Sequence, residues 1–183
     1  MGLVPDIDKD ATISNVRSFF RDDKYYPRIK RRAWFAGIKS PQIDVTGIHG
    51  SRKGNSSESM MIDYAEYAQA KRAIDYAIRG CSNTKMFPSQ QILQFRYVEQ
   101  NNINEVKERL GRKYGHNTYI RADEQACYEF AECLDGVTTR LNVDRKIIPK
   151  MLIQKTGSKR ELNGKKTGSN REVNGKRMGS DLL

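Results

Sequence analysis

The spacing of apolar residues between positions 57 and 79 is the strongest constraint on the fold. Apolar side chains recur there every three or four residues for roughly six helical turns, and a glycine, Gly80, follows. The stripe consists of Met60, Met61, Tyr64, Tyr67, Ala68, Ile74, Ala77 and Ile78, with Lys71 as a polar interruption. This pattern predicts a long amphipathic helix ending at Gly80, which would serve as a packing scaffold or a dimer helix.

Two shorter helices are expected upstream. In TISNVRSFF (12–20) the apolar residues follow the helical repeat, and in YYPRIKRRAWFAG (25–37) proline suits a first turn and glycine an end. We therefore assign residues 1–39 to an N-terminal helical segment and the Gly-, Ser- and Pro-rich residues 40–57 to a linker. The second helix also carries a basic cluster among aromatic residues, namely Arg28, Lys30, Arg31 and Arg32. Such a cluster either binds phosphates or forms the solvated face of an amphipathic helix, and both interpretations stay open.

Helical spacing predicts three further helices, over residues 89–100, 103–110 and 118–134. Asn102 is a suitable cap for the second of these helices, and Gly111 is expected to end it. A short middle helix followed by a longer one has the proportions of a helix-turn-helix, with a turn somewhat longer than the tight form. Any other three-helix bundle would show the same spacing, so this alternative stays open.

If the unit is a helix-turn-helix, the start of its third helix contacts DNA bases. The spacing places four residues on the exposed side of that helix: Asn117, Thr118, Arg121 and Gln125. Arg and Gln suit the edges of guanine and adenine, and the turn residues Arg112 and Lys113 suit phosphates. The same spacing places Tyr119 among the inward-facing residues.

The positive charge of the chain is concentrated in its last part. The formal net charge is +11, and from Lys150 onward nine Lys and Arg stand against three Asp and Glu, a net charge of +6. Two copies of an eleven-residue repeat, TGSKRELNGKK and TGSNREVNGKR, contain too many glycines for a coiled coil. We expect Gly136 to end the last helix of a DNA-binding domain over 57–136, with its core at 89–134. Residues 137–183 are then expected to be a flexible basic tail, or to form short hairpins in the repeats.

Other features narrow the class of protein. The basic charge favours nucleic acid over an anionic membrane surface as a partner, and no apolar run reaches the roughly 18 residues that a membrane span needs. The three cysteines form no C-x-x-C pair and the two histidines lie far from any ligand cluster, so neither a metal site nor another cofactor is expected. The N-terminal sequence does not resemble a signal peptide, and we expect an intracellular protein.

Several stretches, in this order, resemble the ArpU family of phage late-gene transcriptional regulators of Gram-positive bacteria and their prophages. The resemblance covers most of residues 12–134, and its most specific part is SQQILQFRYVEQNNINEVKERLG, followed later by YEFAE. It implies an all-α fold in which residues 89–134 are similar to sigma factor region four, a helix-turn-helix that binds promoter DNA. Matched by position, Thr118, Tyr119 and Arg121 would lie at the start of the recognition helix.

The sequence departs from the family pattern along this helix. Family members tend to carry more Lys and Arg there, whereas here Arg121 is followed by Asp123 and Glu124. Two carboxylates near DNA phosphates would weaken binding, unless they face away or accept hydrogen bonds from cytosine amino groups.

These observations predict a sequence-specific activator of phage or prophage late genes, such as packaging or lysis genes, in the cytoplasm of the bacterial host. Double-stranded DNA is the expected partner, and RNA polymerase and a second copy of the chain are further candidates. The alternative is a phage packaging or assembly adaptor that binds DNA with little sequence specificity. An RNA-binding protein would fit the charge but lacks a module signature. An enzyme is not expected, because Asp63, Glu66, Asp123 and Glu124 form no recognisable catalytic motif.

Overall fold

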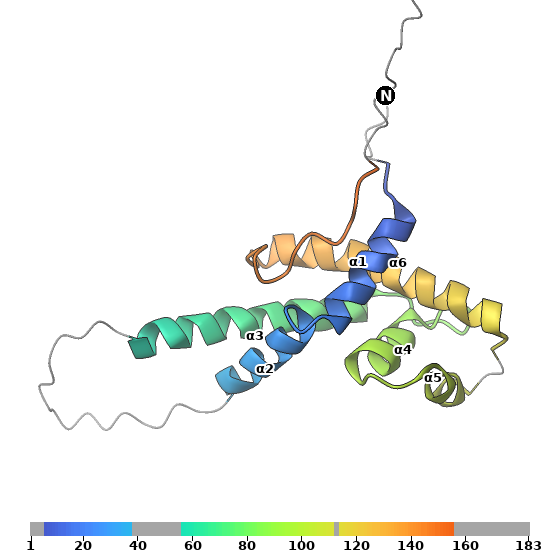
Figure 1. Cartoon of the computed structure of the whole chain (residues 1–183), viewed down its shortest axis with the longest axis horizontal. Coiled ribbons are helices and arrows are strands. Elements are labelled where there is room, and N and C mark those ends of the chain that lie inside the picture. Colours follow the sequence, from blue (N-terminus) through green and yellow to red (C-terminus); the bar gives the residue numbers. More distant parts are fainter. Residues whose placement is uncertain (1–5, 38–55, 112–113, 156–183) are drawn as a thin grey trace, which may run out of the picture.

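The computed structural model describes residues 6–37, 56–111 and 114–155, and this part of the chain is all-α, as the sequence predicts (Figure 1). Its elements are α1 (Lys9–Arg21), α2 (Tyr26–Gly37), α3 (Ser56–Gly80), α4 (Ser89–Ile92), the π-helical segment η1 (Leu93–Val98), α5 (Ile103–Arg109) and α6 (His116–Arg140). Within the described residues, β-type pairing is limited to one isolated bridge between Ile7 and Gln154. This bridge brings the first and last described residues together (Figure 1).

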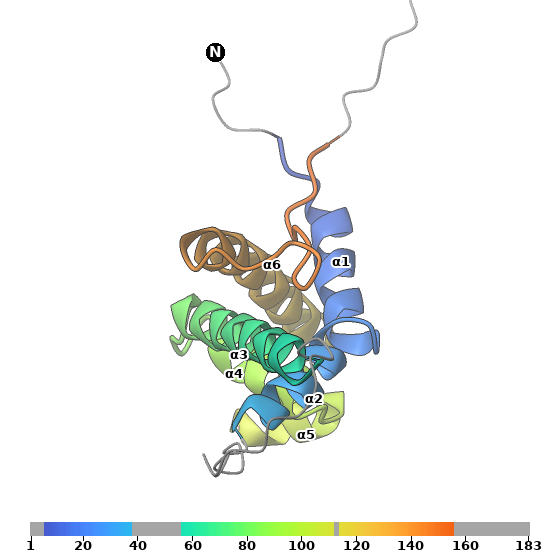
Figure 2. The ribbon, with the colours of Figure 1, turned by 90° about the vertical axis from the view of Figure 1, so that its left-hand side faces the viewer.

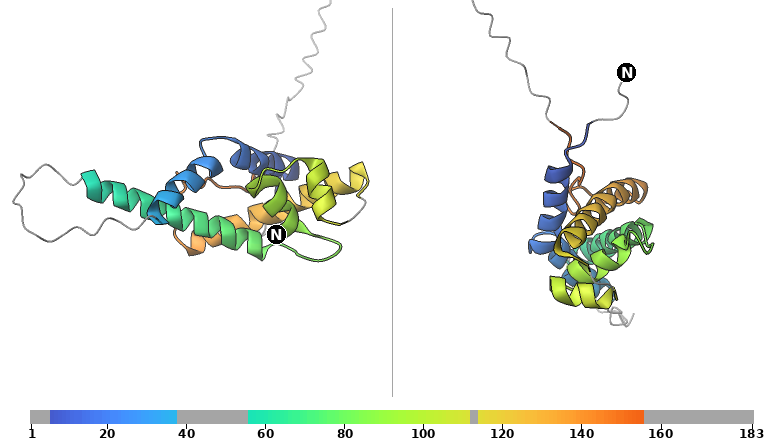
Figure 3. Two further views of the ribbon diagram at one scale, coloured as in Figure 1. Left: turned by 90° about the horizontal axis from the view of Figure 1, so that it is seen from below. Right: turned by 90° about the vertical axis from the view of Figure 1, so that its right-hand side faces the viewer.

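The two long helices, α3 and α6, pack against each other and organise the shorter ones. α2 packs along α3, and α1 packs across α6 (Figures 1 and 2). α4 lies against α6, and α5 contacts η1. Seen from below, α5 and the start of α6 lie at one end of the molecule, and the first turns of α3 lie at the other (Figure 3). The three-helix unit therefore lies at the opposite end of the scaffold from the first turns of α3, and α1 packs against both η1 and α6.

An aromatic core forms where α1 crosses α6. Phe19 and Phe20 of α1, Tyr26 of α2 and Phe130 of α6 are each at most 3% exposed. The ring centroid of Phe20 lies 5.0 Å from that of Phe130 and 5.1 Å from that of Tyr26. Ile74 of α3 belongs to the same cluster, so the helices before the predicted linker share one core with those after it. Buried aromatic side chains remove large apolar areas from water and dominate the energetics of such a core.

The long helix ends at Gly80, as predicted, and its buried face matches the predicted stripe in part, because it also includes Ala70 and Ala73. Its buried residues are Tyr67, Ala70, Ala73, Ile74, Ala77 and Ile78. The polar interruption, Lys71, forms an ion pair with Asp75 one turn later, with 2.6 Å between Nζ and Oδ1. The side chains of Met60 and Met61 lie outside the described part of the structure.

The last helix is longer than predicted, and the flexible tail begins later. α6 continues through Gly136 to Arg140. A glycine inside a helix costs only about 1 kcal/mol relative to alanine, which packing on both sides of it offsets. The prediction of a flexible tail from residue 137 is therefore wrong for residues 137–155. The eleven-residue repeats lie beyond residue 155, outside the described residues.

Residues 141–155 return along α6 and complete the core. Val143, Ile148 and Met151 are buried there. The carboxylate of Asp135 on α6 accepts hydrogen bonds from the backbone N–H groups of Met151 (3.1 Å) and Leu152 (3.0 Å). These contacts explain why a segment without regular secondary structure keeps a defined path, because its backbone donors are satisfied by a buried acceptor.

Candidate nucleic-acid interface

The first helix of the predicted three-helix unit consists of two parts. α4 continues directly into η1, where the N–H of Glu99 donates to the carbonyl of Gln94 (3.0 Å) in the i to i−5 pattern of a π-helix. The chain then leaves the helix through Gln100, whose φ is +62°. The Arg96 guanidinium supports this exit by donating to the carbonyl of Asn101 (2.8 Å). The helix thus ends at Val98, four residues before Asn102, the N-cap of α5.

α5 begins and ends as predicted. The Asn102 side chain accepts from the N–H of Glu105 (3.0 Å), and the Glu105 carboxylate accepts from the N–H of Asn102 (2.9 Å), which makes a capping box. Gly111 follows the helix with a φ of +62°, a conformation that glycine adopts without strain. All of α5 is described, and Val106 alone among its residues is buried. Its ends are therefore fixed mainly by local hydrogen bonds.

α6 begins at His116, slightly before the predicted residue 118. The four residues predicted for its outer side are all exposed: Asn117, Thr118, Arg121 and Gln125. The Gln125 amide donates to the carboxylate of Glu129 (3.0 Å). Arg121 has no hydrogen bond or ion pair within the described residues. The start of α6 therefore presents polar groups to solvent, of which the Arg121 guanidinium is the strongest free donor.

Tyr119 is 3% exposed, which agrees with the inward position that the helical spacing predicts. A buried side chain does not fit the contact with DNA that the family resemblance implies for this residue. Its ring centroid lies 6.5 Å from that of Tyr114 and 5.5 Å from the Lys107 ammonium of α5. Burial raises the pKa of the Tyr119 hydroxyl to about 12, and this hydroxyl has no hydrogen-bond partner in the structure. Tyr119 thus joins α5 to α6. The predicted phosphate contacts, Arg112 and Lys113, lie outside the described residues.

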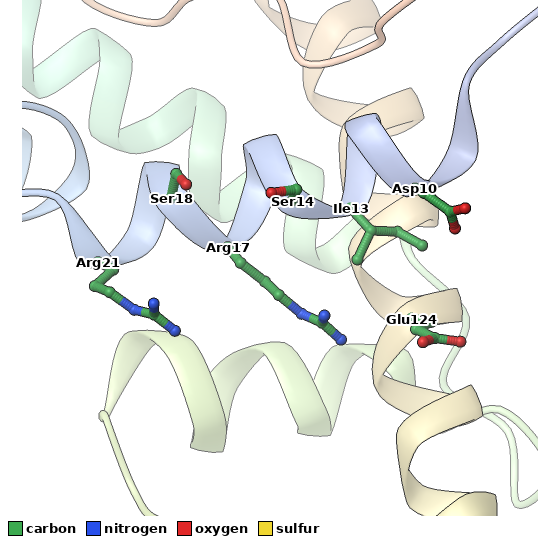
Figure 4. Close-up of a pocket in the computed structure, with 7 residues that line it drawn as sticks. All are labelled: Asp10, Ile13, Ser14, Arg17, Ser18, Arg21 and Glu124. Carbon is green, nitrogen blue, oxygen red and sulfur yellow. The ribbon is translucent and has the colours of Figure 1, made fainter.

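Asp123, one of the two carboxylates that depart from the family pattern, faces the interior. It is 7% exposed and accepts hydrogen bonds from the Arg17 guanidinium (2.7 Å) and the Tyr97 hydroxyl (2.9 Å). Burial raises the pKa of Tyr97 well above its usual value, so this hydroxyl remains a donor at neutral pH. Glu124 is only half-buried and lines a surface hollow together with Arg17 (Figure 4). Asp123 is therefore a link between α1, η1 and α6, and not a group on the outer surface of α6.

The basic residues of α2 contact several groups of the protein itself. The guanidinium groups of Arg28 and Arg32 lie 5.8 and 4.8 Å from the ring centroid of Tyr67. Arg31 pairs with Asp23 at 3.2 Å between two exposed side chains. Cation–π contacts and exposed ion pairs of this kind are weak and do not prevent a phosphate from replacing them.

The aromatic residues beside this cluster lie in two different environments. Tyr26 is buried in the core, whereas Trp34 and Phe35 are 66% and 48% exposed. Lys30 is exposed and Arg32 also lies 3.8 Å from the carboxylate of Asp63 on α3. The first turn of α2 therefore fits an amphipathic helix with its aromatic ring in the core. The last turn does not, because Trp34 and Phe35 expose their rings to solvent.

Other chemical groups in the described residues offer little reactivity. No group of three or more His, Cys, Asp or Glu side chains there could hold a metal ion, and none of the described helices combines the length and apolar character of a membrane span. Burial raises the pKa of the Cys127 thiol to about 12 and also raises the pKa values of Cys81 and Cys133. These thiols therefore stay protonated and weakly nucleophilic at neutral pH.

The chain matches no protein-family model, no curated protein and no solved structure. Fold and surface together define a small all-α protein with a three-helix unit of helix-turn-helix proportions. The resemblance to the ArpU regulators stays a prediction from the sequence.

Proposed function

We propose that this protein is a sequence-specific DNA-binding regulator that activates phage or prophage late genes and contacts DNA with the start of α6. The observation that carries the proposal is the exposed side of the first turns of α6, where Asn117, Thr118 and Arg121 follow a short capped helix and a glycine turn. Arginine can donate two hydrogen bonds to guanine, and asparagine can exchange two with adenine. The protein would act in the cytoplasm of the bacterial host, with RNA polymerase or a second copy as a further partner.

The charge distribution supports the same proposal. The net charge of +11 provides a favourable potential for a polyanion, and the basic last part of the chain would add affinity that is independent of sequence. The inward position of Asp123 removes one of the two carboxylates that would repel DNA phosphates on this helix. Glu124 is then the single acidic departure from the family pattern at this place.

The first experiment is retention of genome fragments from the source of the protein, at roughly physiological salt, followed by sequencing. We expect enrichment of one or a few sites, upstream of late genes. Uniform retention of all fragments would contradict the proposal and favour the packaging or assembly adaptor, for which the mass of the protein in solution would reveal a ring of many subunits.

A matched pair of variants on α6 tests the assigned surface. Arg121→Ala should reduce discrimination between the enriched site and unrelated DNA by about 1–3 kcal/mol. Arg140→Ala removes the same charge from an exposed position roughly 30 Å further along the same helix and should leave discrimination unchanged. If Arg121→Ala weakens binding to every sequence equally, its assigned role in base recognition is wrong.

A further inference from the structure

A groove open to solvent lies between α1, η1 and the first turns of α6. It has a volume of about 240 Å³, and an adjoining hollow of about 290 Å³ shares its main lining residues. Three arginines line both spaces: Arg17 and Arg21 from α1 and Arg96 from η1. Arg17 and Arg21 lie one helical turn apart and extend from α1 in the same direction (Figure 4). We call this space the arginine groove.

The arginine groove has an excess of positive charge. Asp123 is the one carboxylate that lines it, and this carboxylate is already paired with Arg17. Neither Arg21 nor Arg96 has a carboxylate partner among the described residues, and Arg96 uses one donor on the carbonyl of Asn101. Two guanidinium groups thus face the groove without a counter-charge of their own.

Two nearby carboxylates lie to one side of the excess positive charge in the arginine groove. Asp10 and Glu124 line a third hollow, which Arg17 and Arg21 also border. In Figure 4 both carboxylates lie beside Arg17, and Arg21 lies at the far end from them. The part of the groove between Arg21 and Arg96 is therefore its most positive part.

The start of α6 adds unused donors to the same groove. Its N-cap is Gly115, which makes no side-chain capping hydrogen bond, and the following residue, His116, lines the groove. The first N–H groups of a long helix favour an anion. Tyr119 also lines the groove, and its buried hydroxyl lacks a partner in the protein. An unpaired buried donor is costly, and this donor belongs to a residue that lines the same groove as the three arginines, which is an observation independent of their charge.

We propose that the arginine groove is a binding site for a phosphate group, held by Arg21, Arg96 and the start of α6. Guanidinium groups bind phosphate oxygens through paired, charge-assisted hydrogen bonds. The lining residues His116, Tyr119 and Asp123 lie on the core side of α6, whereas Thr118 and Arg121 lie on its outer side. The site is therefore separate from the surface proposed to contact bases, and it does not depend on that proposal.

The test is a titration of the full chain with inorganic phosphate and with pyrophosphate, at constant ionic strength in chloride, followed by the amide resonances of the protein. We expect saturable shifts concentrated at Tyr97, His116 and Tyr119. The variant with Arg21→Gln and Arg96→Gln should lose at least tenfold in affinity. Arg72→Gln, an exposed arginine of α3 with no pairing among the described residues, is the matched control and should titrate like the wild type.

Duplex DNA distinguishes the two sources of a phosphate group. If the groove binds the DNA backbone, the double variant should reduce the slope of log affinity against log salt by about two, and Arg72→Gln should not. If the groove binds a free phosphate ligand, the double variant should lose phosphate binding but bind DNA with the same affinity and salt dependence as Arg72→Gln. Two results together would overturn the proposal. The first is that phosphate causes unsaturated shifts spread over many basic residues, and the second is that the double variant unfolds at the wild-type temperature and binds DNA as the wild type does.

Discussion

The junction of α1 with α6 and the short helix α5 are stabilised by different interactions. At the junction, Phe19, Phe20 and Phe130 are each at most 3% exposed and pack ring against ring. In α5, Val106 is the one buried side chain, and a capping box and a glycine turn define the ends of the helix. The junction depends on apolar contacts from distant parts of the chain, whereas α5 depends on hydrogen bonds between near neighbours.

The position of the candidate interface follows from these two kinds of contact. α6 runs from the aromatic core to the surface that we assign to DNA, so Thr118 and Arg121 belong to the same rigid helix as Phe130. α5 has few buried contacts and can open at a lower free energy than the whole fold. We therefore expect the first turns of α6 to keep their position when α5 is perturbed.

The largest expected effect follows removal of a ring from the junction. Phe130→Ala should destabilise the whole fold by about 3–5 kcal/mol, because it leaves a cavity against Phe19 and Phe20. Val106→Ala removes only two methyl groups and should cost about 2 kcal/mol, expressed mainly as faster hydrogen exchange within α5. Denaturant unfolding measures the first change and amide exchange the second. Equal global destabilisation by both variants would show that α5 is part of the same cooperative core.

A smaller effect is expected at the polar link between the two regions. Asp123→Asn should destabilise the protein by about 1–3 kcal/mol, because it weakens the acceptor of Arg17 and Tyr97. The loss stays below that of a fully buried ion pair because the Arg17 side chain is 37% exposed. The control, Asp75→Asn, weakens a partly exposed pairing between neighbouring turns of α3 and should cost about 0.5 kcal/mol or less.

Thermal unfolding and DNA affinity together distinguish the roles of Asp123. Unchanged stability of Asp123→Asn, with tighter binding to all DNA sequences, would place this carboxylate on the DNA surface and contradict the inward position.

The parts that sequence reasoning predicted correctly depend on short-range patterns. The apolar stripe ending at Gly80, the cap at Asn102 and the turn at Gly111 each use signals within a few residues. The exposure of Thr118 and Arg121 follows from the helical repeat alone. These features are predictable because neighbouring residues determine the local conformation.

The parts that it missed depend on contacts between distant segments. The partners of Asp123, Arg17 and Tyr97, are on α1 and η1, and no spacing in the sequence indicates that they meet. Residues 141–155 pack back along α6 because the Asp135 carboxylate accepts hydrogen bonds from two of their backbone N–H groups. The arginine groove cannot be predicted from the sequence for the same reason, because α1 and η1 are far apart along the chain and adjacent only in the fold.

Loss of the N-cap of α5, Asn102, and loss of the N-cap of α1, Asp8, should reduce stability by similar amounts but affect different parts of the fold. Asn102→Ala and Asp8→Ala each remove a side chain that accepts a backbone N–H, and each should cost about 1 kcal/mol. The loss at Asn102 should appear as faster amide exchange across α5, because Val106 is the one buried residue of that helix. The loss at Asp8 should be confined to the first turn of α1, whose later turns are held by Phe19 and Phe20. Loss of protection throughout α1 would contradict this account.

The smallest effects distinguish Gly111 and Gly136, two of the glycines that the sequence predicts at helix ends. Gly111 has a φ of +62°, so Gly111→Ala should destabilise the protein by about 1 kcal/mol even though no atom lies within 4 Å of the added Cβ. Gly136 lies inside α6 with similar open space, and Gly136→Ala should stabilise the protein by up to about 1 kcal/mol. Shifts of the unfolding temperature in opposite directions are expected. If Gly136→Ala is also destabilising, α6 ends at Gly136 as the sequence suggested, and the return of residues 141–155 must begin from a different place.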